Sequence, residues 1–297
     1  MHIPFTEKYR PKNLDEVIGN QEVIECLKSF GIDNLPNMLF YGPPGTGKTT
    51  TIRAVLKDLP SQNILELNAS DHRGIDTVRT LIKEFSTVQL NGPKFVILDE
   101  ADSMSKDAQG ALRRIIEDCK NTRFCFICNY YKKIIEPIVS RCTKYRFSPV
   151  SGVNRIKEVC LKESVRFTEE GLETIETFSD GDMRKVMNDI DGMKGAYDEL
   201  SKNSVLDFYG MPKDDVFINI FNSLISDSFD ECKLKIAKCE VECAELISKI
   251  SPIVVNSTLK NKLSMLKLIS EIEHRLAMGC SNIIQINSFI GAFIIYR

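Results

Sequence analysis

Short apolar runs and longer stretches of helical periodicity alternate along the first half of the chain. Apolar runs of strand length occur at 37–41, 63–68, 94–98, 124–128 and 144–149. Runs of this kind, bounded by turn residues, indicate strands that are buried on both faces of a sheet. Because helix-like stretches separate them, we expect a mostly parallel α/β sheet flanked by helices, closing near residue 149.

Apolar residues spaced three and four apart predict the helices between these strands. The clearest pattern runs from 107 to 119, with Arg113 and Arg114 directed toward its flank. Each pattern places one apolar stripe against the sheet and leaves a polar stripe outside. The other expected apolar faces are Val23, Ile24, Leu27 and Phe30; Ile52, Val55, Leu56 and Leu59; and Ile75, Val78, Ile82 and Phe85.

The strand pattern stops after Pro149, and only helical periodicity continues. Residues 152–200 contain three helical patterns, the last with Asp182 as its N-cap, and about four more helices follow 210–212. The apolar load of these last helices exceeds what their own core needs, which indicates burial against partner subunits. We therefore expect an α/β domain at 1–149, a small all-α lid at 150–210 and an all-α C-terminal oligomerisation domain at 211–297.

A glycine-rich segment joins the first predicted strand to the helix after it. It runs Gly42-Pro43-Pro44-Gly45-Thr46-Gly47-Lys48-Thr49 and matches the phosphate-binding pattern G-x-x-x-x-G-K-[ST] in its required strand, turn and helix context. Glycines let consecutive amides turn inward, where the helix dipole also favours an anion. Lys48 is expected to reach the β- and γ-phosphates, and Thr49 to hold Mg²⁺. These groups predict a site for a nucleoside triphosphate and Mg²⁺, and the family resemblance given below implies ATP.

Polar residues follow two further strands where each strand ends. The third strand runs into Asp99 and Glu100, and the fourth is followed by Asn129. The carboxyl ends of parallel strands meet at one edge of a sheet, so these side chains should lie near the phosphate loop. Asp99 would complete the Mg²⁺ shell and Glu100 would activate a water. The Asn129 amide could bind that water or the γ-phosphate.

Composition is that of an ordinary globular protein, with 297 residues, 43% hydrophobic and 27% charged. The net charge of −2 argues against a chain that coats nucleic acid by bulk charge, although it allows a local basic stripe. We find no signal-peptide core and no uncharged apolar span of membrane length. We therefore expect a soluble intracellular protein without a membrane segment.

The ten cysteines are scattered, several within apolar runs, and we expect them to be reduced thiols. Cys125 and Cys128 have the spacing of a zinc-binding pair, but they lie in a predicted core strand. The three histidines supply no second ligand pair, so we expect no zinc.

Two further segments have more than one interpretation from their residues alone. Arg79 and Lys83 lie one turn apart on a predicted helix, and a solvated face is the default for such a pair. A role in binding phosphates needs further evidence. The segment 7–11 could close over a nucleotide base, although by itself it is more typical of a surface loop.

Together these residues resemble the AAA+ ATPases, and within them the small subunits of the eukaryotic and archaeal sliding-clamp loader, replication factor C. The resemblance covers the first 190 residues, and it is weaker in the C-terminal third. The tract Ile134-Ile135-Glu136-Pro137 looks most like the small subunit numbered four in the human complex. His72 departs from the family, which usually carries an acid there. The other matching segments are Glu7-Lys8-Tyr9-Arg10-Pro11, Leu39 to Thr49, Glu66 to Asp71, Leu98-Asp99-Glu100-Ala101-Asp102, Ala111-Leu112-Arg113-Arg114, Asn129-Tyr130 and Ser140-Arg141-Cys142.

The resemblance implies a role for each matching residue. Asn129 would be sensor 1, and Arg184 would be sensor 2 on the lid. Arg141 would be the arginine finger that completes the ATP site of an adjacent subunit, so the catalytic set would be Lys48, Asp99, Glu100, Asn129, Arg141 and Arg184. Besides Asn129 and Arg184, the nucleotide would be bound by Tyr9, Arg10, Pro11, Val17 and Ile18 around the adenine, and by Gly42, Pro43, Pro44, Gly45, Thr46, Gly47, Lys48, Thr49 and Thr50 around the phosphates.

The resemblance also implies partners. It suggests an ATPase subunit of a nuclear heteropentameric clamp loader that opens the sliding clamp and loads it onto primer-template DNA in replication and repair. Arg79 and Lys83, and also Arg113 or Arg114, would contact DNA phosphates. Two alternatives remain open: a hexameric AAA+ motor or remodeller, and a subunit that binds ATP without hydrolysing it. Ser140-Arg141-Cys142 and the absence of a pore-loop aromatic pair argue against the first, and the intact set from Lys48 to Arg184 argues against the second.

Overall fold

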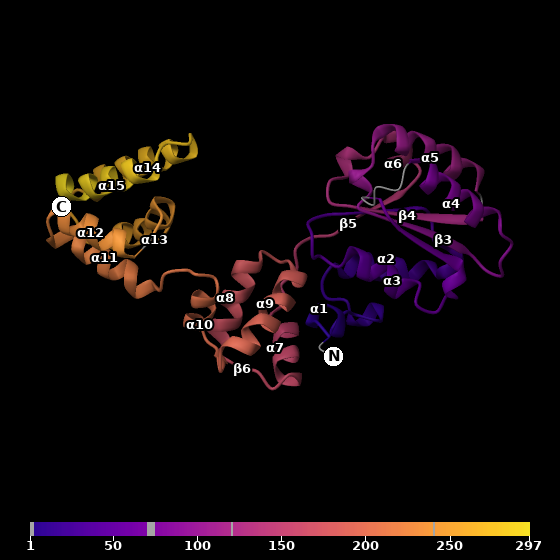
Figure 1. The fold of residues 1–297 in the computed structure, drawn as a ribbon, viewed down its shortest axis with the longest axis horizontal. Coiled ribbons are helices and arrows are strands. Elements are labelled where there is room, and N and C mark those ends of the chain that lie inside the picture. The colour runs from indigo at the N-terminus through magenta and orange to yellow at the C-terminus, as the bar shows by residue number, and fades with distance from the viewer. Residues whose placement is uncertain (1–2, 70–74, 120, 240) are drawn as a thin grey trace. The chain divides into compact units, whose positions relative to one another are not determined.

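A computed structural model describes residues 3–69, 75–119, 121–239 and 241–297 (Figure 1). It divides into two compact units, Met1–Lys202 and Asn203–Arg297. The expected boundary near residue 149 lies inside the first unit, and the one near 210 lies a few residues after this division. The three-domain organisation therefore stays a prediction.

The first unit is built on five parallel strands in the order β2-β3-β4-β1-β5. This arrangement confirms the predicted parallel α/β fold. Neighbouring strands in the sheet are separated by helical segments of the chain, as parallel strands require. The strands are β1 (Met38–Tyr41), β2 (Ile64–Asn68), β3 (Lys94–Asp99), β4 (Thr122–Cys128) and β5 (Thr143–Arg146).

Helices cover both faces of the sheet (Figure 1), and the alternation of side chains along each strand explains why. Val96 and Leu98 of β3 pack on one face with residues of α4, α5 and α6, whereas Phe95 and Ile97 pack on the other with residues of α2 and α3. The helices are α2 (Gln21–Phe30), α3 (Lys48–Val55), α4 (Ile75–Thr87), α5 (Lys106–Asp118) and α6 (Glu136–Val139).

The same alternation separates Cys125 from Cys128. Cys125 lies in the core on the α2 and α3 face, and Cys128 lies in the core on the opposite face. Two thiols on opposite faces of one strand cannot chelate one ion. Burial raises the pKa of Cys128 to about 12, so its thiol stays protonated. All ten cysteines are free, which confirms the expectation of reduced thiols.

Two expected helical faces were wrong in part. Helix α3 ends at Val55, so Leu59 lies beyond it, although Leu59 still packs against the same core as Ile52. In α2, Ile24 and Leu27 are buried, but Phe30 at the last position is 36% exposed. In α3 the apolar period continues past the end of the helix, whereas in α2 its last member is the final residue of the helix.

The lid portion of the first unit has three helices: α7 (Val153–Lys162), α8 (Glu169–Ser179) and α9 (Met183–Ala196). It also contains a short parallel pair, β6 (Arg166–Phe167) and β7 (Glu199–Leu200), which the apolar pattern did not predict. Two residues are too few to show alternation. A short helix α1 (Phe5–Lys8) packs against α9.

The second unit is helical in its described residues. We expected about four helices after residue 212, whereas the structure has five, and a further helix, α10 (Lys202–Phe208), precedes them. They surround one apolar core that includes Phe221, Leu246 and Phe289. The five are α11 (Asp214–Ser226), α12 (Phe229–Lys238), α13 (Cys243–Asn256), α14 (Lys262–Ala277) and α15 (Asn282–Tyr296).

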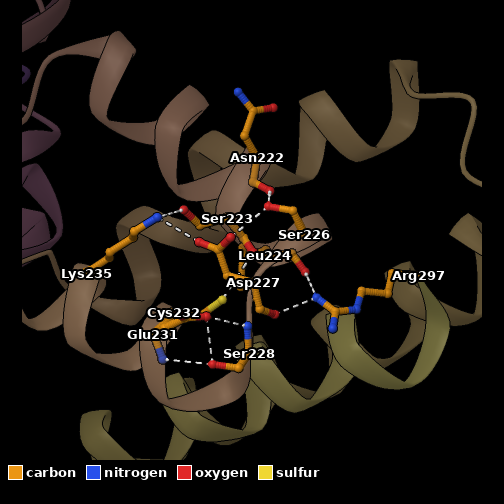
Figure 2. A network of polar contacts seen from close by, with 10 residues as sticks. All are labelled: Asn222, Ser223, Leu224, Ser226, Asp227, Ser228, Glu231, Cys232, Lys235 and Arg297. Carbon is orange, nitrogen blue, oxygen red and sulfur yellow. Dashed lines mark hydrogen bonds and ion pairs between the residues drawn. The ribbon is translucent and has the colours of Figure 1, made fainter.

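A polar network fixes the turn between α11 and α12 (Figure 2). Lys235 donates to Ser223 Oγ at 2.8 Å and to Asp227 Oδ2 at 2.6 Å. Arg297, just after α15, donates to the carbonyl oxygens of Leu224 at 3.3 Å and Asp227 at 2.6 Å. These carbonyls lie at the end of α11, where the helix itself offers no donors. The network therefore ties three helices together.

Lys94 ties α4 to the sheet. Its side chain is buried, and its ammonium donates to the carbonyl oxygens of Phe85 at 3.1 Å, Ser86 at 2.5 Å and Val88 at 2.8 Å. Carbonyls at the end of a helix have no partner within the helix. One ammonium at the start of β3 therefore holds the C-terminal end of α4 in place.

We expect Lys94→Met to lower the free energy of unfolding by about 1–3 kcal/mol, because three carbonyls lose a buried charged donor. Urea denaturation of the two proteins measures this difference. Lys132→Met, which removes an exposed ammonium, is the matched control and should change stability by less than about 0.5 kcal/mol. Equal losses for both variants would contradict the proposed role of Lys94.

Candidate nucleotide-binding site

The glycine-rich loop lies between β1 and α3 and has a backbone that most residues cannot adopt. Gly45 has a φ of 68° and Gly47 one of 91°. Space is also limiting, because a Cβ atom at Gly45 would overlap the Asp182 carboxylate, and one at Gly42 would overlap the Phe147 carbonyl. The backbone conformation and the close packing of the loop therefore both require glycine at positions where the motif has it.

Lys48 begins α3 and is only 7% exposed. Its ammonium donates to the carbonyl oxygens of Gly42 at 2.7 Å and Pro43 at 2.6 Å, and to Asn129 Oδ1 at 3.0 Å. Burial lowers the pKa of Lys48, and the neighbouring carboxylate of Asp99 partly opposes that shift. The ammonium thus joins the loop to the carboxyl edge of the sheet.

The acidic residues lie at the same edge. Thr49 Oγ1 donates to Asp99 Oδ2 at 2.8 Å, and the Glu100 amide donates to Asp99 Oδ1 at 2.9 Å. Glu100 has a φ of 53°, in the left-handed region that non-glycine residues seldom adopt. The carboxylate of Asp102 accepts from the amides of Asn129 at 3.3 Å and Tyr130 at 3.1 Å. The loop that carries Asn129 is thereby held beside β3.

The lid contacts the phosphate loop directly. Asp182 caps α9, as predicted, because its carboxylate accepts from the amides of Arg184 at 2.9 Å and Lys185 at 3.1 Å. The amide of Met183 donates to the Gly45 carbonyl at 3.3 Å. The start of α9 therefore presents Arg184 to the loop.

These groups surround a cavity of about 230 Å³. Its lining includes most of the predicted nucleotide residues: Tyr9, Arg10, Pro11, Val17, Ile18, Pro44, Gly45, Thr46, Gly47, Lys48, Thr49, Thr50, Asp99, Glu100, Asn129 and Arg184. Gly42 and Pro43 do not line the cavity and instead hold Lys48 through their carbonyls.

The residues that the sequence analysis missed come from the two ends of the first unit. They are Thr6, Glu7, Val150, Arg155, Met183 and Met187. Arg155 and Met187 belong to amphipathic lid helices, where nothing in the local pattern separates a cavity residue from a core residue. Glu7 lies within the recognised segment 7–11 and Met183 lies between Asp182 and Arg184, so their neighbours were the available signal.

Arg141 lies outside this cavity. It donates to the Pro137 carbonyl at 2.7 Å and pairs with Glu117 of α5 at 2.5 Å. Its side chain is 34% exposed. The structure therefore does not bring Arg141 together with the other predicted catalytic residues of the same chain.

The predicted DNA-contacting residues are on the surface of the first unit. Arg79 and Lys83 are exposed on α4, one turn apart, and Arg113 and Arg114 are exposed on α5. Arg113 pairs with Glu117 at 3.1 Å. His72, where we noted a departure from the family, lies outside the described residues.

The arrangement fits a nucleoside triphosphate and its metal. A glycine loop at a helix start, a buried ammonium and the Arg184 guanidinium suit polyphosphate. The Thr49 hydroxyl and Asp99 carboxylate offer the hard oxygen ligands that Mg²⁺ prefers. Across the described residues, no helix is both long and apolar enough to cross a membrane.

Fold and site together define a P-loop ATPase of the AAA+ class. The family described as "ATPase family associated with various cellular activities (AAA)" matches residues 38–150, and "Replication factor C C-terminal domain" matches residues 212–292. Replication factor C subunit 5 of Homo sapiens is 38% identical over the whole chain and 93% of that protein. The replication factor C small subunit of Archaeoglobus fulgidus is 36% identical over 97% of this chain and 96% of its own. The chain belongs to the replication factor C small-subunit family of clamp-loader ATPases.

The comparisons do not single out one subunit. Human replication factor C subunit 4 is 38% identical over 96% of this chain, the same identity as human subunit 5. The particular resemblance to subunit four therefore stays a prediction. Among solved structures, the RuvB branch migration motor of Thermotoga maritima matches with a TM-score of 0.57 over 81% of this chain and 88% of that one. At 20% identity, this match supports the fold alone.

We expect Gly45→Ala to weaken ATP binding at least tenfold, because the added methyl overlaps Asp182 in a backbone conformation suited to glycine. Calorimetric titration of the purified chain measures the dissociation constant. Gly110→Ala in α5 is the matched control, since a Cβ there meets no neighbour. The control should bind ATP normally and, as a helix-interior glycine, gain up to about 1 kcal/mol of stability. Unchanged affinity in Gly45→Ala would count against this loop as the phosphate site.

Proposed function

We propose that this chain binds ATP with Mg²⁺ in the cavity and hydrolyses it only within a ring of replication factor C subunits. The observation that carries the proposal is the position of Arg141. Every other predicted catalytic residue lines one cavity, whereas Arg141 is on the surface, paired with Glu117. A guanidinium placed there can serve a neighbouring subunit.

Within the cavity each side chain has a separate task. Lys48 and Arg184 would neutralise the phosphates, and the Thr49 hydroxyl and Asp99 carboxylate would hold Mg²⁺, which would supply positive charge to the phosphates. Glu100 accepts the proton of the attacking water, and Asn129 orients that water or the γ-phosphate. An arginine of the adjacent subunit would supply the remaining positive charge at this site, as Arg141 of this chain would at a neighbour's site, an effect worth on the order of 10³-fold or more in related enzymes.

We also propose that the assembly acts on DNA and on a sliding clamp. ATP binding would let the ring open the clamp and bind a primer-template junction, and hydrolysis would release both. The support is family membership together with four exposed basic residues on α4 and α5, which suit phosphate contacts without sequence readout. The C-terminal unit would join the subunits, and the complex would work in the nucleus.

Arg141→Ala should leave the ATP affinity of this chain unchanged and lower turnover at a neighbouring site by at least tenfold in the assembled complex. Radiolabelled ATP hydrolysis by complexes that carry the change in this subunit alone provides the measurement. Lys48→Ala is the control, since it should abolish nucleotide binding at this chain's own site. A turnover defect at the chain's own site alone would rule out action in trans.

Removing the charges of Arg79 and Lys83 together should weaken primed-DNA binding by the complex and reduce the slope of log affinity against log salt by about 1 to 2. Fluorescence anisotropy at several salt concentrations gives both quantities. Lys260→Ala with Lys267→Ala removes two exposed charges from the C-terminal unit and serves as the matched control. Parallel salt slopes for mutant and parent would assign Arg79 and Lys83 to an ordinary solvated face.

A further inference from the structure

A carboxylate outside the cavity holds the N-terminal helix α1 against the lid. Glu163, at the C-terminal end of α7, accepts from Lys8 Nζ at 2.5 Å, Tyr9 Oη at 2.5 Å and Lys194 Nζ at 2.7 Å. Its side chain is only 8% exposed. Two donors come from the N-terminal segment and one from α9, so Glu163 joins two lid helices to the start of the chain.

Other contacts attach the same segment to the same helices. The Phe5 amide donates to Asp191 Oδ2 at 3.3 Å, and the Lys194 ammonium lies 5.5 Å from the centre of the Phe5 ring. Arg155 of α7 donates to the Tyr9 carbonyl at 3.1 Å. By its position in the sequence, this segment would be expected to pack on the α/β part. These contacts attach it to the lid helices instead.

The held segment forms one wall of the nucleotide cavity. Thr6, Glu7, Tyr9, Arg10 and Pro11 line it, whereas Glu163 does not. This wall is distinct from the phosphate loop, which lies at the start of α3. Val17 and Ile18, which line the same cavity, are apolar and suit the nucleoside rather than the phosphates.

We propose that Glu163 is a positioning residue that sets the nucleoside wall of the ATP site by fixing Lys8 and Tyr9 against the lid. This inference rests on the proposed ATP-binding function. Glu163 acts on the nucleoside end alone. Its loss should therefore weaken the binding of ligands that carry a nucleoside and leave the binding of ligands without one unchanged. The three donors hold the pKa of Glu163 at about 2, Lys194 having the largest effect, so that the carboxylate is charged at neutral pH.

The test compares two ligands on the full-length chain. Glu163→Gln keeps the size of the side chain but removes its charge, and we expect its ATP affinity to fall about tenfold. Its affinity for Mg²⁺-tripolyphosphate, which has no nucleoside, should stay within twofold of wild type. Calorimetric titration measures both affinities, and a melting curve without ligand shows that the variant is folded.

Two further variants sharpen the comparison. Glu169→Gln removes an exposed lid carboxylate that pairs with Lys157 at 2.7 Å, and both of its affinities should match wild type. Tyr9→Phe removes one of the three donors to Glu163, and it should weaken ATP binding in the same direction by a smaller factor. Tyr9→Phe also retains the ion pairs, so it tests the proposal if Glu163→Gln does not fold.

Unchanged ATP affinity in folded Glu163→Gln would overturn the proposal. Equal weakening of ATP and tripolyphosphate binding would also overturn it, because that result indicates a general loss of structure. A wild-type chain that bound neither ligand would instead overturn the proposed ATP-binding function, so the two failures are distinguishable.

Discussion

The close approach of the lid to the phosphate loop is the constraint on which the site depends. Gly45 has room only for a hydrogen where it meets Asp182, and the same carboxylate caps α9. One residue therefore begins the lid helix and sets its distance from the loop. Because Arg184 follows two residues later, its position depends on this contact. The packing of the phosphate loop against the start of α9, which are far apart in the sequence, thus determines where a residue of the site lies.

The buried Lys48 is the second such constraint. Lys48 is only 7% exposed, so its ammonium needs partners, and it has two loop carbonyls and the Asn129 amide oxygen. Asn129 is itself positioned through Asp102, so β1, β3 and β4 all contribute to the environment of one charge. These three acceptors use all three N–H groups of the ammonium, so a phosphate oxygen arriving in the cavity would replace one of them. The exchange keeps the buried charge paired.

The same unit also places charged groups outside its own site. Glu117 pairs with both Arg113 and Arg141, so a residue proposed to contact DNA and one proposed to act in trans share a single carboxylate. Exposed pairs of this kind contribute little to stability, because water screens them. These two ion pairs instead fix the positions of the guanidinium groups of Arg113 and Arg141. The proposed role of Arg141 in completing a neighbour's site would account for an arginine that this chain's own cavity does not use.

The sequence by itself determined the sheet, the order of its helices and the phosphate loop. These features follow from local apolar periodicity and from a motif whose glycines and lysine are contiguous, so short-range information is sufficient for Lys48, Thr49 and Asp99. Tertiary structure alone decided the attachment of the N-terminal segment to the lid, the contribution of Arg155 and Met187, and the pairing of Glu163 with Tyr9. The residues of those contacts lie more than a hundred positions apart, and their local patterns are those of ordinary amphipathic helices. Only the packing of the lid on the loop shows which of their side chains reach the cavity.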